Sequence, residues 1–95
     1  MPDVSRRVVV GSRVGLHARP AKLVAQAAAK LPVVVTIAKD GGNPVDARSL
    51  LSLMAMGAKQ GDEVTLEADG DGAAEAVEEI AALVEQDLDE EPADA

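Results

Sequence analysis

The sequence predicts one α+β domain, an open-faced β-sandwich in which a four-stranded antiparallel sheet carries three helices on one face. Segments with the two-residue period of strands and segments with the helical period follow one another in the order βαββαβα. The strands are short, and short strands in this order favour an antiparallel sheet covered by helices. No internal repeat or linker divides the 95 residues, of which 47% are apolar, so we expect a single core.

The first strand and the first helix are predicted from residues 4–10 and from the segment around Pro20. Residues 4–10 are rich in β-branched side chains and end at Gly11. Pro20 suits the first turn of a helix, because its missing N–H would have no helical partner there. Apolar residues then recur at helical spacing until Pro32 ends the helix: Leu23, Val24, Ala27 and Leu31.

A hairpin and a short helix are predicted next. Residues 33–38 read as the second strand, and the Asp-Gly-Gly-Asn sequence at 40–43 is a strong turn signal. A short third strand follows around Val45. Ser49 is a good N-cap for a short apolar helix that stops at Gly57.

The last strand and the last helix complete the predicted domain. Residues 64–68 alternate between apolar and polar side chains, which indicates a half-buried strand. A turn at 69–72 leads into a helix whose apolar positions run from Ala73 to Leu88. The remaining residues are acidic and contain a proline, so we expect one domain at 1–88 and a flexible acidic tail at 89–95.

The composition excludes several classes of function. A net charge of −8 argues against nucleic acid and anionic membranes as partners. The chain has no cysteine, no signal-like segment and no apolar run of membrane-spanning length, so we expect a cytoplasmic protein without disulfides. The acidic turn at 69–72 lacks the spaced ligands and closing glutamate of a calcium loop, so no metal site is predicted.

The charges are divided unevenly along the chain. Residues 1–60 contain all nine basic residues and three acids, whereas residues 61–95 contain fourteen acids and no base. The simpler interpretation is that the C-terminal third has acidic helix faces and a solubilising tail. The functional interpretation is that the basic part meets a phosphate or the acidic surface of a partner.

His17, the only histidine, precedes the predicted helix by a few residues. A histidine that carries a phosphoryl group needs an accessible neutral ring nitrogen and donors for the phosphate oxygens. Since a residue before proline is biased against the α region, we expect Arg19 to be the last non-helical residue or the cap. The backbone N–H groups of Ala18 and Arg19, the helix dipole and the Arg19 guanidinium would then favour a phosphate beside His17. From the residues alone, a solvated loop histidine remains an equal alternative.

Two separate segments resemble the signatures of HPr, the histidine-containing phosphocarrier family of the sugar phosphotransferase system. Residues 15–21, Gly-Leu-His-Ala-Arg-Pro-Ala, resemble its active-site motif. Residues 48–57 resemble its second signature, in which a regulatory serine opens a short hydrophobic helix, and residues 60–66 resemble the turn and strand after it. The resemblance spans about residues 4–88 with both motifs in register, which makes it specific.

The resemblance implies a carrier that turns over no substrate by itself and needs no cofactor. His17 would accept a phosphoryl group on Nδ1 from phosphorylated enzyme I and pass it to the A domain of a sugar-specific enzyme II. Arg19 would stabilise the phosphate, together with the backbone N–H groups of Ala18 and Arg19. The chain departs from the family at Val14, where a small polar residue is more usual, and Arg13 adds a positive charge next to it.

The short helix after Ser49 has more apolar residues than one face can bury. We expect Leu53 and Met56 in the core. The resemblance places Leu50, Leu51 and Met54 beside His17, so we expect these three in transient contact with a partner of a monomeric carrier. Ser49 is predicted to be the N-cap, and in some relatives the matching serine is phosphorylated by a dedicated kinase. The predicted docking residues are Ala18, Lys22, Arg48, Leu50, Leu51, Met54 and Ala55.

Three other functions stay open. The chain could be a paralogue of the carrier that serves nitrogen regulation or dihydroxyacetone phosphorylation. It could also be a regulatory binding protein that acts through Ser49. A hydrolase with His17 as general base has little support, because no Ser, Asp or Glu lies between Arg13 and Leu31. The sequence names neither the sugar nor the circuit.

Overall fold

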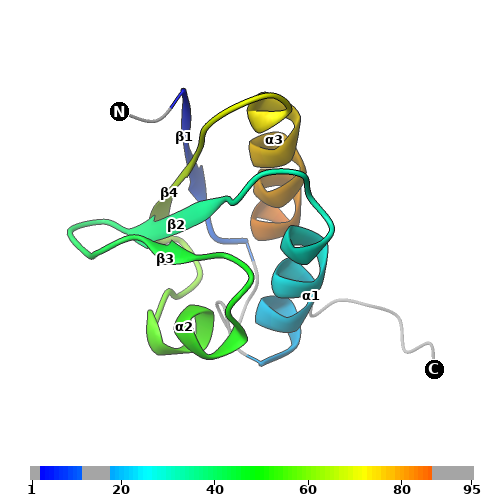
Figure 1. Ribbon diagram of the computed structural model, residues 1–95. Coiled ribbons are helices and arrows are strands. Elements are labelled where there is room, and N and C mark those ends of the chain that lie inside the picture. Colours follow the sequence, from blue (N-terminus) through cyan, green and yellow to red (C-terminus); the bar gives the residue numbers. More distant parts are fainter. Residues whose placement is uncertain (1–2, 12–17, 87–95) are drawn as a thin grey trace.

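The computed structural model describes residues 3–11 and 18–86, which form one sheet and three helices (Figure 1). The element order βαββαβα is the predicted one. In chain order the elements are β1 (Val4–Val9), α1 (Ala18–Ala29), β2 (Thr36–Lys39), β3 (Val45–Asp46), α2 (Leu50–Ala55), β4 (Glu63–Ala68) and α3 (Ala73–Glu85). The acidic tail predicted at 89–95 lies outside the described residues.

The sheet has the strand order β1-β4-β2-β3, with every neighbouring pair antiparallel. The last strand of the chain, β4, therefore lies inside the sheet between β1 and β2. The three helices cover one face, with α1 and α3 packed against each other and α2 beside β3 and α1 (Figure 1). The structure thus confirms the predicted open-faced α+β sandwich.

The core lies between the sheet and the helices and contains no aromatic residue. In β4 the alternation predicted from the sequence is confirmed, because Val64, Leu66 and Ala68 are buried while Thr65 and Glu67 are partly exposed. The strand register places the buried residues of β1 and β2 beside these: Val8 opposite Val64, and Ile37 opposite Leu66. Aliphatic side chains alone thus fill the interior, and the helix residues that cover them are also small or branched.

Two sequence expectations are corrected. The second strand was expected at 33–38, but β2 begins at Thr36 because its pairing with β4 runs only from Thr36 to Lys39. Arg19 was expected to precede or cap the first helix, but α1 begins at Ala18 and includes Arg19. The restriction before proline is a preference, and here the burial of Pro20 and Ala21 outweighs it. Pro20 remains in the first turn, where an N–H has no helical partner.

Candidate functional site

His17 lies outside the described residues, as does the whole segment 12–17. The structure describes the chain on both sides of that segment. On one side is Gly11 after β1, and on the other is Ala18, the first residue of α1.

Both polar groups of the Gly11 backbone, its N–H and its carbonyl, form hydrogen bonds. Its N–H donates to the carbonyl oxygen of Val84 in α3 at 3.0 Å, and its own carbonyl accepts from Nε2 of Gln60 at 3.3 Å. A Cβ at this position would lie 1.9 Å from the carbonyl oxygen of Glu85, so only glycine allows the chain to pass this close to α3. The end of β1 is therefore fixed against α3 immediately before the segment that contains His17.

The first turn of α1 supplies the donors predicted for a phosphate. Ala18 and Arg19 are its first two residues, and the first four N–H groups of a helix have no carbonyl partner within that helix. The Arg19 side chain is exposed, whereas Pro20 and Ala21 next to it are buried and attach the helix start to the core. This arrangement fits anion binding by the start of a well-anchored helix together with an arginine.

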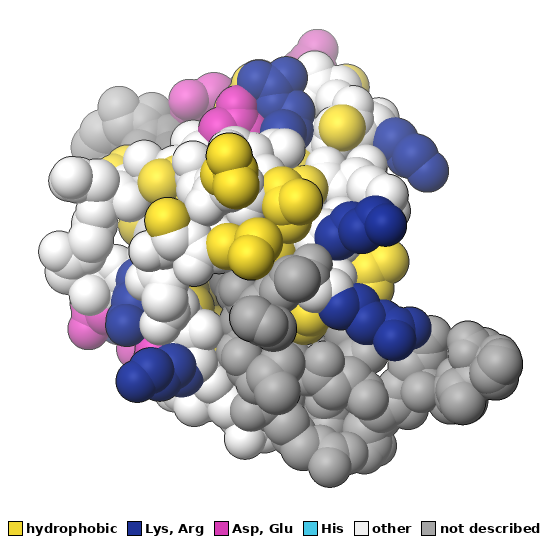
Figure 2. Space-filling model, turned by 90° about the horizontal axis from the view of Figure 1, so that it is seen from below, with side chains coloured by type: hydrophobic (Ala, Val, Ile, Leu, Met, Phe, Trp, Pro, Cys, Tyr) yellow, Lys and Arg dark blue, Asp and Glu magenta, His cyan; other side chains and the backbone are white. Residues whose placement is uncertain are grey.

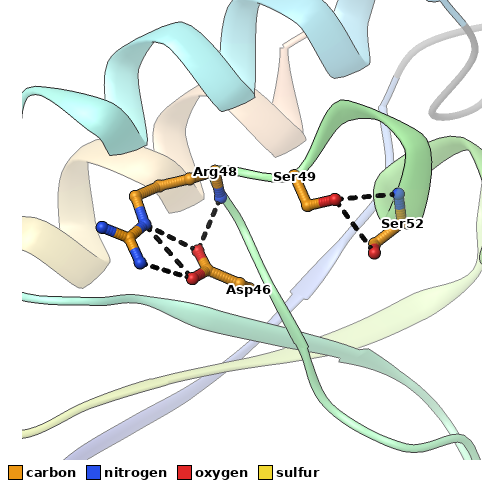
Figure 3. Close-up of polar contacts among 4 residues, drawn as sticks. All are labelled: Asp46, Arg48, Ser49 and Ser52. Carbon is orange, nitrogen blue, oxygen red and sulfur yellow. Dashed lines mark hydrogen bonds and ion pairs between the residues drawn. The ribbon is translucent and has the colours of Figure 1, made fainter.

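Ser49 is the N-cap of α2, as predicted. Its backbone is extended (φ −92°, ψ 105°), and its Oγ accepts a hydrogen bond from the backbone N–H of Ser52 at 3.2 Å. The hydroxyl of Ser49 also bonds to the hydroxyl of Ser52 at 3.0 Å (Figure 3). These bonds establish the structural role of Ser49, and any modification of this half-buried side chain would have to replace them.

The apolar residues of α2 divide as predicted. Leu53 is fully buried, and Met56 after the helix packs against the core. Leu50, Leu51 and Met54, which we call the α2 apolar patch, are 38%, 78% and 38% exposed. Figure 2 shows hydrophobic side chains gathered on the face seen from below, with Lys and Arg side chains around them. The other predicted docking side chains within the described residues, Lys22, Arg48 and Ala55, are exposed as well.

One contact that the sequence reasoning missed connects Asp46 and Arg48 at the junction of β3 and α2 (Figure 3). Asp46 Oδ1 accepts from the backbone N–H of Arg48 at 2.9 Å and from its Nε at 3.0 Å, while Oδ2 accepts from Nη2 at 2.7 Å. These side-chain hydrogen bonds from Arg48 lower the pKa of Asp46, and the same bonds raise the pKa of Arg48. An aspartate two residues before an arginine, at the end of a strand, was the available sequence signal.

Two further findings concern only the part of the chain that the structure describes. None of its helices is long and apolar enough to cross a membrane. No three of its His, Cys, Asp or Glu side chains lie close enough together to hold a metal ion.

Comparison with known proteins identifies the family. The model of the family described as "PTS HPr component phosphorylation site" matches residues 4–86. The phosphocarrier protein HPr of Streptomyces coelicolor is 48% identical over 87 residues, covering 92% of this chain and 94% of that protein.

Solved structures agree with this assignment. HPr from Bacillus anthracis superposes with a TM-score of 0.80 at 38% identity, covering 85% of this chain and 95% of that one. The Bacillus subtilis catabolite-repression protein Crh, solved as a domain-swapped dimer, gives a TM-score of 0.67 at 42% identity over 85% of this chain and 92% of that one. The predicted resemblance is therefore confirmed, and the chain belongs to the HPr family of phosphocarrier proteins of the phosphotransferase system.

Proposed function

We propose that this protein carries phosphoryl groups between enzyme I and the A domains of sugar-specific enzymes II, with Nδ1 of His17 as the acceptor. The observation that carries the proposal is the sequence Gly-Leu-His-Ala-Arg-Pro-Ala at 15–21, inside a family match named for its phosphorylation site. The proposed carrier is a cytoplasmic monomer without a cofactor.

The proposed step is the transfer of a phosphoryl group to Nδ1 of His17. The bond between phosphorus and the donor atom of phosphorylated enzyme I breaks as a bond from phosphorus to Nδ1 of His17 forms, and the donor atom keeps the electron pair. Onward transfer to the enzyme II domain breaks the bond from phosphorus to Nδ1 of His17 in the same way. Because phosphoryl transfer depends mainly on positioning and on stabilisation of charge, a helix start and one arginine are sufficient protein machinery.

The first turn of α1 has the groups that this step needs. The backbone N–H groups of Ala18 and Arg19 lie at the positive end of a 12-residue helix, where anions are stabilised. The Arg19 guanidinium adds a planar set of donors that matches phosphate geometry. The contacts of Gly11 with α3 and of Pro20 with the core hold the chain on both sides of residues 12–17.

The α2 apolar patch supports a role in docking. Exposed Leu and Met side chains are typical of surfaces that bind proteins transiently, and exposed cations at Lys22 and Arg48 accompany the patch. The proposed docking surface therefore has an apolar centre and a basic rim, and Ala18 and Ala55 belong to it as well.

The test is incubation with enzyme I and phosphoenolpyruvate, followed by intact mass and an acid-lability assay. We expect an acid-labile gain of one phosphate in the wild type and none in His17→Ala. Arg19→Ala should slow the transfer without lowering the melting temperature. A His17→Ala protein that is still labelled would refute the assignment of the acceptor.

A second candidate function acts through Ser49. The similarity to Crh, a catabolite-repression protein, favours a regulatory role, and a kinase would be the partner. A folded protein that gains no phosphate from active enzyme I would favour this role, or that of a paralogue serving nitrogen regulation or dihydroxyacetone phosphorylation. Labelling of Ser49 by a kinase, lost in Ser49→Ala, would then identify the regulatory function.

A further inference from the structure

The side chains of Asp46 and Arg48 form a forked ion pair at the turn between β3 and α2. Nε and Nη2 of Arg48 both bond to the carboxylate, and the backbone N–H of Arg48 bonds to it too. Such two-point pairing fixes the plane of a guanidinium in a way that a single contact does not. The Arg48 side chain is nevertheless half-exposed, so it remains accessible to a partner.

We propose that Asp46 is a positioning residue, which holds the Arg48 guanidinium ready to bind a carboxylate on the acidic surface of a partner protein. The inference rests on the proposed function, because the partner used to test it is phosphorylated enzyme I. Arg48 is the residue that touches the partner, and Asp46 acts through it.

The backbone around the pair is rigid enough for this role. The carbonyl oxygen of Asp46 accepts from the N–H of Ser49 at 3.0 Å, and the N–H of Ala47 donates to the carbonyl oxygen of Val35 at 2.9 Å. Ala47 itself is fully buried. Both members of the pair are therefore carried by a turn that is fixed to the sheet on one side and to α2 on the other.

The donors of Arg48 are only partly used by Asp46. A guanidinium has five N–H groups, and the pair with Asp46 uses the one on Nε and one on Nη2. The two on Nη1 and the second on Nη2 remain for an acceptor outside the domain, and no other acceptor for them is found among residues 3–11 and 18–86. An arginine that is already oriented loses less rotamer freedom when it binds that acceptor.

The position of Arg48 and a second cation on the neighbouring helix favour an acidic protein as its partner. Arg48 directly precedes Ser49 and the first residue of the α2 apolar patch in the sequence, and Figure 3 shows its side chain extending from this turn to Asp46. Lys22 of α1, the helix that packs against α2, is a second exposed cation. Charges at the rim of an interface mainly set its register and encounter rate, and oriented donors add selectivity for carboxylates.

The test is a double-mutant cycle on the rate of phosphorylation by enzyme I, with phosphoenolpyruvate in excess and the carrier as the varied substrate. The variants are Asp46→Asn, Arg48→Gln and the double substitution, with Asp40→Asn as the control. Asp40 is an exposed carboxylate in the turn between β2 and β3, so its substitution makes the same change in charge away from Arg48. Thermal unfolding of each variant fixes a temperature at which all are folded.

We expect Arg48→Gln to raise KM about 3- to 10-fold with kcat unchanged, because the lost contact contributes to binding and not to chemistry. Asp46→Asn should raise KM about 2- to 3-fold in the wild-type background and have no further effect when Arg48 is already replaced. The KM of Asp40→Asn should equal that of the wild type.

Each other outcome refutes a defined part of the reasoning. An equal effect of Asp46→Asn in both backgrounds would mean that Asp46 acts on the fold and not through Arg48. A lower KM for Asp46→Asn would mean that Asp46 only neutralises Arg48. An unchanged KM for Arg48→Gln overturns the inference alone, whereas a wild type that accepts no phosphate overturns the proposed function and this inference together.

Discussion

Leu51 and Leu53 lie two residues apart in α2, yet their replacement should affect different properties of the protein. The Leu53 side chain is fully buried, and that of Leu51 is 78% exposed. Leu53→Ala should therefore reduce stability, and Leu51→Ala should reduce the affinity for a partner. The pair is internally controlled, because both changes remove the same atoms from the same helix.

The size of each effect follows from the burial. Removing a buried leucine side chain from a packed core costs about 2–5 kcal/mol. For a domain of this size, about 1 kcal/mol shifts Tm by roughly 4–8 °C, so Leu53→Ala should lower Tm by about 10 °C or more. Burying a whole leucine side chain contributes about 1.5–3 kcal/mol, and the exposed part of Leu51 would contribute about 1–2 kcal/mol on docking. That corresponds to a loss of affinity of roughly 5- to 30-fold for Leu51→Ala.

The chain has no Trp, Tyr or Phe, so unfolding is best followed by far-UV circular dichroism in urea or on heating. Affinity is measured as the KM for phosphorylation by enzyme I. The unfolding free energy of Leu51→Ala should lie within about 0.5 kcal/mol of the wild-type value, as is usual for substitutions of exposed residues. The proposed docking surface is wrong if Leu51→Ala is phosphorylated with an unchanged KM. The burial argument is wrong if Leu51→Ala is as destabilising as Leu53→Ala.

Three further substitutions test the contacts of Gly11, Ser49 and Asp46, with the free energy of unfolding in urea as the measured quantity. Gly11→Ala should destabilise by about 2–4 kcal/mol, because its Cβ would overlap the Glu85 carbonyl; a loss under about 0.5 kcal/mol would contradict this close approach. Ser49→Ala should cost about 1 kcal/mol through the lost cap, and a neutral result would mean that solvent replaces it. Since folding lowers the pKa of Asp46, its pair with Arg48 stabilises the protein above the ordinary aspartate pKa and is lost as pH falls through the lowered value. The difference in unfolding free energy between wild type and Asp46→Asn should thus be constant near neutral pH and shrink below about pH 4, and a constant difference down to pH 2 would refute the linkage.

The element order and the core were predictable because local signals agreed with the packing. The alternation in β4 and the N-cap at Ser49 are properties of a few neighbouring residues, and the structure retains both. The predicted start of β2 at residue 33 was wrong because the length of a strand depends on its partner strand. Here the partner, β4, lies about thirty residues further along the chain. The predicted start of α1 after Arg19 was wrong because the burial of Pro20 and Ala21, a tertiary effect, outweighed a local backbone preference.

The candidate site shows the same division between local and tertiary information. Counting how many side chains one helix face can bury predicted that some apolar residues of α2 are exposed, whereas the choice of Leu51 followed from the family resemblance. The contact of Gly11 with α3 joins residues more than seventy positions apart, and no pattern around Gly11 indicates it. The pair of Asp46 and Arg48 is local in sequence, but it depends on how the chain turns between β3 and α2.

The uneven charge distribution has a structural explanation and a functional one, and they apply to different faces. In the described part of the chain, acids of the C-terminal third pair with cations of the sheet. Arg6 contacts both Glu78 and Glu85 of α3, Arg7 contacts Glu63, and Lys39 contacts Asp62. Exposed pairs of this kind contribute little stability each, but they neutralise the positive charge of β1 and β2.

The basic residues at the rim of the proposed docking surface belong to a different set. Within the described residues, the acid that pairs with Arg48 comes from β3 and not from the C-terminal third, and no ion pair is found for Lys22. Within the described residues, the acidic third therefore pairs with cations of the sheet and forms no ion pair with Lys22 or Arg48. A protein with a net charge of −8 can in this way present a basic rim to an acidic partner, and the local charge, not the total, should govern their encounter.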